Sequence, residues 1–71
     1  MKKILIIAGS CNSGTAGLQA DIKTCARLNC YSATAVTSLV AETTDAINSV
    51  VCLESSFVKD ELRTLAEEFS F

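Results

Sequence analysis

Proline and histidine are absent from this 71-residue chain, and glycine occurs only three times. Because histidine is missing and no two cysteines are spaced C-x-x-C, no motif supports a zinc site, and we predict no metal ligands. Basic residues are also scarce: six Lys and Arg stand against eight Asp and Glu, which gives a net charge of −2. This balance, with no evident basic face, argues against a nucleic-acid partner.

Long apolar runs are missing as well. The run that starts at Ile4 is far shorter than the ~20 residues of a membrane-spanning helix. Gly9 and Ser10 then lead into a structured pattern, where a signal peptide would have its cleavage region. We therefore predict a cytoplasmic protein with no membrane partner.

The four cysteines are predicted to be free, mostly buried thiols, because nothing in the chain directs it to an oxidising compartment. They are Cys11, Cys25, Cys30 and Cys52. Cys11 is expected to be the exception because it lies in the loop, where the N-terminus of the following helix favours a reactive thiolate. No base lies near it in the sequence, so an ordinary loop thiol is the favoured interpretation.

The most informative segment is the glycine loop that begins at Gly9, between an apolar strand pattern and a helical pattern. A strand, a glycine loop and a helix build a ligand site at the carboxyl end of the sheet in α/β proteins. Gly9 and Gly14 have the spacing of a Walker A loop, but Thr15 and Ala16 follow where that loop needs lysine and a hydroxyl residue. The position of Gly17 does not complete the dinucleotide fingerprint G-x-G-x-x-G.

Hydrophobic periodicity predicts one small α/β domain with three strands and two helices. The strands are expected over 3–8, 31–41 and 47–53, and the helices over 15–28 and from Ser55 or Ser56, one of which caps the last helix. The continuous apolar run of the first strand indicates burial on both faces. The strand–helix–strand order at the start predicts a right-handed, parallel βαβ unit.

Three finer expectations follow from the helical patterns. Asp21 shares a helix face with Gly14 and Gly17, so it is expected to face the ligand space. Asn29 tolerates the left-handed conformation that ends a helix. The apolar stripe of the last helix is expected to be core and consists of Val58, Leu62, Leu65 and Phe69.

Two helices cannot cover both faces of a three-stranded parallel sheet, and the sheet edges stay open. The chain is therefore interpreted as the opening third of a larger α/β domain. Its expected partners are a complementary C-terminal chain or a second copy bound through the open sheet edges.

The residues also form a recognisable pattern. Its parts are Ile6-Ile7-Ala8-Gly9-Ser10, Ser13-Gly14-x-Ala16-Gly17-x-Gln19-Ala20-Asp21-x-Lys23-Thr24 and Thr37-x-Leu39-Val40-Ala41. Together they closely resemble the hydroxymethylpyrimidine/phosphomethylpyrimidine kinases of thiamine biosynthesis, along nearly the whole chain. The resemblance implies an incomplete ribokinase-like fold, in which residues 1–71 form the N-terminal, substrate-side part of one kinase domain with no second domain.

Kinases of this family transfer phosphate from ATP to 4-amino-5-hydroxymethyl-2-methylpyrimidine and then to its monophosphate. The resemblance implies that Gly9 and Ala16 line the pyrimidine pocket, that Asp21 faces the substrate and that Val40 packs on the ring. Glu42 stands where the family usually has a glutamine that binds the aminopyrimidine. A glutamine both donates and accepts, whereas an ionised glutamate only accepts.

Other positions depart from the family pattern. Cys11 and Asn12 stand where the family usually has an acidic residue followed by a small residue or proline. The ATP site, the anion hole and the catalytic base of the family lie beyond the part that this chain resembles. We therefore assign no catalytic residue, expect neither ATP nor Mg²⁺ to bind this chain alone, and predict no kinase activity for it alone.

Three alternatives stay open at this point. The first is a non-enzymatic remnant of such a kinase. The second is a relative of the pyridoxal kinases, against which the run from Gln19 to Thr24 argues. The third is a small anion- or nucleotide-binding module, which rests only on the helix start at Thr15 and Ala16.

Overall fold

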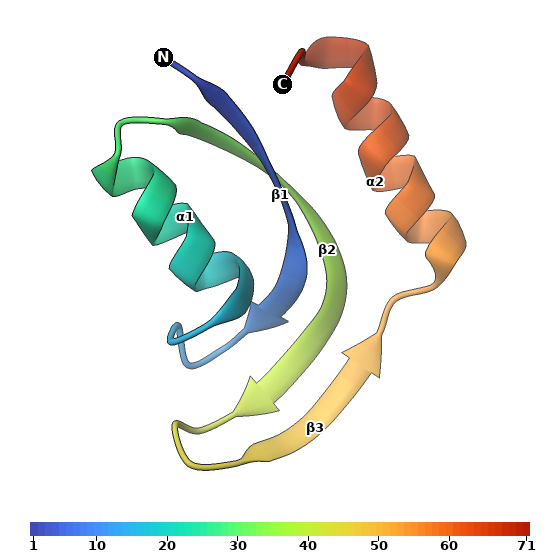
Figure 1. Ribbon diagram of the computed structural model, residues 1–71. Coiled ribbons are helices and arrows are strands. Elements are labelled where there is room, and N and C mark those ends of the chain that lie inside the picture. The colour runs from blue at the N-terminus through green and yellow to red at the C-terminus, as the bar shows by residue number, and fades with distance from the viewer.

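In the computed structural model, which describes residues 1–71, three strands and two helices follow one another in the order β1, α1, β2, β3, α2. The elements span Lys3–Cys11 (β1), Gly17–Arg27 (α1), Tyr31–Glu42 (β2), Ile47–Cys52 (β3) and Ser55–Glu68 (α2). β1 and β2 are parallel, and α1 and α2 lie on opposite sides of the strands (Figure 1). The predicted α/β class, the number of elements and the βαβ start are confirmed. Neither helix is long and apolar enough to cross a membrane.

The third strand corrects the expectation of a parallel sheet. β3 pairs antiparallel with β2, and the strand order is β1-β2-β3. Only residues 43–46 join the two strands, whereas a parallel crossover needs a dozen or more residues. The short gap between the two predicted strands is itself the signal for a hairpin.

The ends of the elements differ from the predictions in two places. β1 continues to Cys11, because its pairing with β2 resumes after a register shift between Ala8 and Ser10. No serine caps α2: the N-cap residue is Glu54, which makes no side-chain cap bond. The predicted stop of α1 is confirmed, since Asn29 has a φ of 57°.

Burial is lower than the sequence predicts. The buried residues are Ile6, Cys11, Leu18, Ala33 and Ala35. Burial of the first strand on both faces is wrong for this chain, because α1 is the helix that contacts β1 whereas α2 contacts β2. Ile7 is accordingly 54% exposed.

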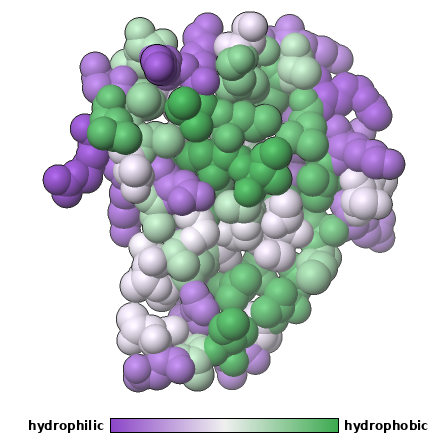
Figure 2. Space-filling model, viewed as in Figure 1, coloured by the Kyte–Doolittle hydropathy of each residue, from purple (hydrophilic) through white to green (hydrophobic).

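The chain forms a thin slab whose short dimension is the width of the three-stranded sheet. Its Cα atoms extend over 36 × 32 × 9 Å, and the short dimension matches two interstrand spacings of about 4.8 Å. The accessible surface is 4954 Å², whereas a compact monomer of this length exposes about 4,200 Å². Hydrophobic residues gather in the middle of the face seen in Figure 2, with hydrophilic residues around them.

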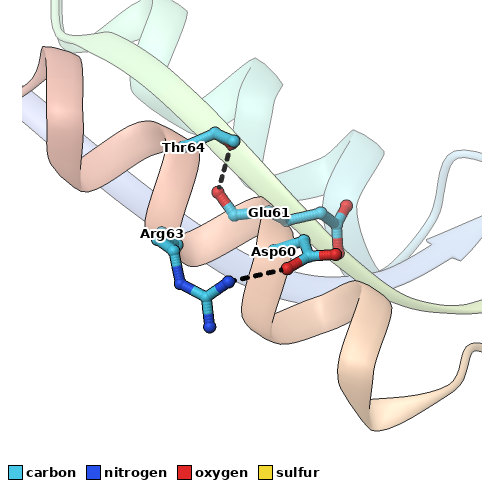
Figure 3. Close-up of polar contacts among 4 residues, drawn as sticks. All are labelled: Asp60, Glu61, Arg63 and Thr64. Carbon is cyan, nitrogen blue, oxygen red and sulfur yellow. Dashed lines mark hydrogen bonds and ion pairs between the residues drawn. The ribbon is translucent and has the colours of Figure 1, made fainter.

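α2 covers the part of β2 that β3 does not reach. The β2–β3 pairing ends at Ser38 and Cys52. Two residues earlier in β2, the backbone N–H of Val36 bonds to the side chain of Glu61 in α2 instead of to β3. The Oε1 of Glu61 accepts this 2.9 Å hydrogen bond, whereas its buried Oε2 has no partner. Figure 3 shows Glu61 beside Asp60 and Arg63, which form an exposed ion pair of 3.0 Å.

The predicted apolar stripe of α2 is confirmed as its packing face. Val58, Leu62, Leu65 and Phe69 are all half-buried, while most other residues of the helix are exposed. Glu61 is also half-buried, so a carboxylate lies among these apolar side chains. A carboxylate oxygen buried without a partner destabilises the fold, because it has lost its hydration.

We expect Glu61→Gln to stabilise the chain by up to about 1 kcal/mol, because the amide oxygen still accepts from Val36 and no charge is desolvated. Glu61→Ala is expected to destabilise it by about 1–2 kcal/mol, because the Val36 N–H loses its acceptor. Urea unfolding followed by circular dichroism measures both. Glu67→Gln, on an exposed position of α2, is the matched control and stays within about 0.5 kcal/mol. Equal losses for Glu61→Gln and Glu61→Ala would contradict this account.

Candidate functional site

The glycine loop brings the carboxyl end of β1 against the start of α1. Gly17 begins α1 with a φ of 63°, and a Cβ there would collide with the carbonyl oxygen of Gly9. Gly14 also has a positive φ, of 78°, but a Cβ there would meet only the flexible end of Lys23. Gly17 is therefore required both by backbone conformation and by close packing. The predicted strand–loop–helix arrangement is confirmed.

Gly9 lies at the irregular point of β1, where the pairing with β2 shifts register. A Cβ on Gly9 would lie 2.5 Å from the Ser38 hydroxyl oxygen. Gly9 therefore lets β2 come close to the end of β1, while the close approach of α1 depends on Gly17. This is the position that the sequence analysis assigned to the pocket wall.

Gln19 fastens the first turn of α1 to the end of β1. Its Oε1 accepts from the Cys11 N–H at 2.8 Å, and its Nε2 donates to the Ser10 hydroxyl at 2.8 Å. Gln19 belongs to the family motif, but no role for it was predicted from the sequence. The sequence feature that could have indicated this role is an amide side chain in the first turn of a helix that follows a glycine loop. Backbone groups of such a loop need hydrogen-bond partners, and an amide can supply them.

Glu42 ends β2 beside the loop. Its backbone N–H donates to Asn12 Oδ1 at 2.7 Å, and its Oε1 accepts from the Cys11 thiol. Its Oε2 makes no hydrogen bond within the chain. The side chain is half-buried and borders a hollow of about 350 Å³ with Asn12, Ala41 and the β2–β3 hairpin residues.

Val40 lies two residues before Glu42 and is half-buried. It borders a second hollow, of about 260 Å³, which shares Asn12 and Ala41 with the first. Ser10 also borders this second hollow, so both hollows open next to the glycine loop. The structure thus brings Val40 and Glu42 together around Asn12.

Asp21 lies elsewhere. It is exposed on α1 and borders a separate hollow of about 320 Å³ with Thr24, Cys25 and the β1 residues 4–7. This hollow shares no residue with the one that Glu42 borders. Ala16, the N-cap residue of α1, is exposed and borders no hollow.

The cysteines are all free thiols in the structure, but the prediction that most of them are buried is wrong. Cys11 is 4% exposed, whereas Cys25 and Cys30 are half-buried and Cys52 is exposed. Cys52 is exposed because it lies at the end of β3, whose residues are all exposed. Cys11 lies at the junction of β1, β2 and α1, and this packing buries it.

The site residues do not fit the magnesium ion that accompanies ATP in kinases. No three His, Cys, Asp or Glu side chains come together in a way that could hold a metal ion. Glu42 already has its Oε1 bound to a thiol, and Asp21 borders a different hollow. We derive no step through a metal from these residues.

The family model and the curated relatives point to one family. Residues 12–71 match the family model for phosphomethylpyrimidine kinase. The hydroxymethylpyrimidine/phosphomethylpyrimidine kinase of Escherichia coli K12 is 45% identical over 64 residues, which are 87% of this chain and 24% of that protein. The first curated relatives are matched over only 12–24% of their own length.

Solved structures are similar over nearly the whole chain. The phosphomethylpyrimidine kinase of Clostridium difficile 630 has a TM-score of 0.92 at 32% identity, over 97% of this chain and 30% of that one. The pyridoxal kinase of Bacillus subtilis, solved as an ADP complex, has a TM-score of 0.87 at 38% identity, over 99% of this chain and 27% of that one. Identity over this segment therefore does not separate the two kinds of kinase.

We expect Gly17→Ala to destabilise the chain by roughly 2–4 kcal/mol, because the new methyl group meets the Gly9 carbonyl and the residue keeps a left-handed backbone. Gly14→Ala is the matched control, since it has the same backbone constraint without a rigid neighbour, and should lose only about 1 kcal/mol. Urea unfolding compares the two. Equal losses would mean that the close approach of α1 to β1 contributes nothing.

Proposed function

Because this chain belongs to the phosphomethylpyrimidine kinase family, we propose that it forms the pyrimidine-binding part of a kinase that phosphorylates 4-amino-5-hydroxymethyl-2-methylpyrimidine and its monophosphate with ATP. The observation that carries the proposal is the position of Glu42. Its Oε2 has no partner within the chain, and its side chain borders a hollow at the carboxyl end of β2, beside the glycine loop. Ligands of open α/β sheets bind at such ends.

The chemistry of Glu42 favours an aminopyrimidine over pyridoxal. An ionised carboxylate only accepts hydrogen bonds, and the exocyclic amine of the pyrimidine donates them. Pyridoxal has no exocyclic amine. Val40 would then pack against the ring from the adjoining hollow, while Gly9 lets the backbone of β1 approach the ligand.

Asp21 and Ala16 are also proposed to contact the substrate, although neither borders the hollows at Glu42 and Val40. Asp21 borders the hollow along the free edge of β1, so its contact with the substrate requires a ligand or chain that extends over that edge. Ala16 sits at the exposed start of α1, where unpaired N–H groups favour a negatively charged substituent such as the phosphate of the monophosphate.

ATP and a complementary chain belong to the same proposal. The ATP site and the catalytic base are expected from residues outside these 71, by resemblance to the family. The free edge of β1 and the exposed side chains Ile7, Val50 and Val51 are surfaces that a complementary chain or a second copy would cover. The cytoplasmic location also remains a prediction.

We expect the purified chain to bind 4-amino-5-hydroxymethyl-2-methylpyrimidine more tightly than pyridoxal, because only the former offers an amine to Glu42. Amide proton–nitrogen NMR spectra during titration should show shifts at Gly9, Val40 and Glu42. Glu42→Ala should weaken binding about tenfold or more, as expected for a lost hydrogen bond to a charged group. Glu54→Gln, an exposed carboxylate outside the hollow, is the matched control. Tighter binding of pyridoxal would support a pyridoxal kinase instead.

The 71 residues by themselves are expected to show no phosphate transfer from ATP in the presence of Mg²⁺, since they contain no phosphate-binding lysine motif and no metal site. Mixing them with the Escherichia coli kinase that lacks its matching segment should restore turnover. A coupled ADP assay measures this, and the Gly17→Ala chain is the control that should fail to complement. Turnover by the chain alone would overturn the expectation.

A further inference from the structure

Cys11 and Glu42 meet beneath the candidate site, although 31 residues separate them in the chain. The Cys11 thiol donates to Glu42 Oε1, and the Ser13 hydroxyl oxygen lies 3.0 Å from the Cys11 sulfur. Cys11 is buried, whereas Glu42 is half-buried and reaches the hollow. The contact therefore connects a buried residue at the end of β1 to a residue that borders the hollow.

The donor and acceptor of this contact are fixed by chemistry. An ionised carboxylate has no proton to give, so the hydrogen must come from the sulfur. Since the single thiol proton points to Glu42, Ser13 must be the donor to the sulfur. The geometry thus makes the Cys11 sulfur the donor and Glu42 the acceptor.

The backbone at both residues is held by amide side chains. Gln19 Oε1 accepts from the Cys11 N–H, and Asn12 Oδ1 accepts from the Glu42 N–H. Around the contact, α1 contributes Gln19, and the loop contributes Asn12 and Ser13. The charged group that α1 brings to the loop is Lys23, whose ammonium donates to the Gly14 carbonyl at 3.4 Å, and Glu42 takes part in no ion pair.

We propose that Cys11 is a positioning residue for Glu42, and that the two act as one unit in selecting the substrate ring. The thiol occupies Oε1 and fixes the carboxylate, which leaves Oε2 free to accept from a ligand in the hollow. The unit therefore favours a ring with an exocyclic amine, which offers two N–H donors, over a ring whose donors are hydroxyl groups. This last step rests on the proposed function; the thiol–carboxylate unit itself does not.

The two positions are also those at which the sequence departs from the family pattern, and the contact relates the two departures. The resemblance to the family implies an acidic residue at position 11 and a glutamine at position 42, whereas this chain has a thiol and a carboxylate. In the implied family pair, position 42 donates and position 11 accepts, whereas in this chain Cys11 donates and Glu42 accepts. Both pairs contain one carboxylate. Each departure is thus compatible with the other.

Thiol labelling tests the unit without any ligand. The rate at which iodoacetamide modifies Cys11 in the native chain is followed by peptide mass spectrometry at fixed pH. Glu42→Ala removes the acceptor that engages the Cys11 sulfur, so Cys11 should react severalfold faster. Asp45→Asn removes one charge from the exposed hairpin turn and is the matched control, with an unchanged rate. Equal rates in the original and Glu42→Ala chains, when both give the same native circular dichroism spectrum, would overturn the proposal.

A double-mutant cycle tests whether the two residues are coupled. Cys11→Asp places two carboxylates in contact and should lower the urea midpoint clearly. Combined with Glu42→Gln, the same substitution should lose much less, because a carboxylate at position 11 then accepts from an amide at position 42. An equal loss in both backgrounds would overturn the coupling.

The binding assay separates this inference from the proposed function. In Cys11→Ser the hydroxyl still donates to Glu42, so the preference for the aminopyrimidine over pyridoxal should be retained, and Cys11→Ala should reduce it severalfold. If neither ring binds while the labelling and the cycle behave as expected, the unit stands and the proposed function fails. If the aminopyrimidine binds equally well to Cys11→Ala, the positioning role fails and the proposed function stands.

Discussion

The close approach of α1 to the end of β1 is the constraint on which the rest of this site depends. Gly17 has no side chain, so the first turn of α1 can lie against the Gly9 carbonyl. At that distance Gln19 reaches the backbone of Cys11 and the hydroxyl of Ser10. Cys11 is then buried under the loop and meets Glu42 from β2. A longer spacing between α1 and β1 would remove each of these contacts in turn, because hydrogen bonds weaken steeply with distance.

Local patterns predicted the elements of the fold but not their relation in space. The parallel βαβ start follows from a strand, a helix and a strand with a connection long enough for a crossover. Asn29 ends α1 as its residue type suggests, whereas Glu54 replaces the expected serine cap because the backbone of α2 begins one residue earlier. Burial of β1 on both faces was the largest error. A continuous apolar strand is suited to a sheet that is covered on both faces. In this chain only one helix, α1, contacts β1.

The site was predictable where the family pattern and the topology agree. Gly9, Val40 and Glu42 lie at the carboxyl ends of neighbouring strands, so their proximity follows from parallel pairing of β1 and β2. The contact between Cys11 and Glu42 was not predictable from spacing, since it depends on the register shift at Gly9 that carries Cys11 opposite Val40. Gln19 was missed for a related reason: its partners lie in another element and become visible only when α1 is placed on β1.

Asp21 shows how the uncovered edge of the sheet bears on function. Its hollow is bounded by α1 and by residues 4–7 of β1, whose outer edge has no neighbouring strand. A free strand edge exposes backbone donors and acceptors that favour pairing with another chain. Such pairing would close this hollow on its open side. The carboxylate of Asp21 would then face an enclosed space instead of solvent. Coverage of the β1 edge would therefore both stabilise the slab and enclose Asp21.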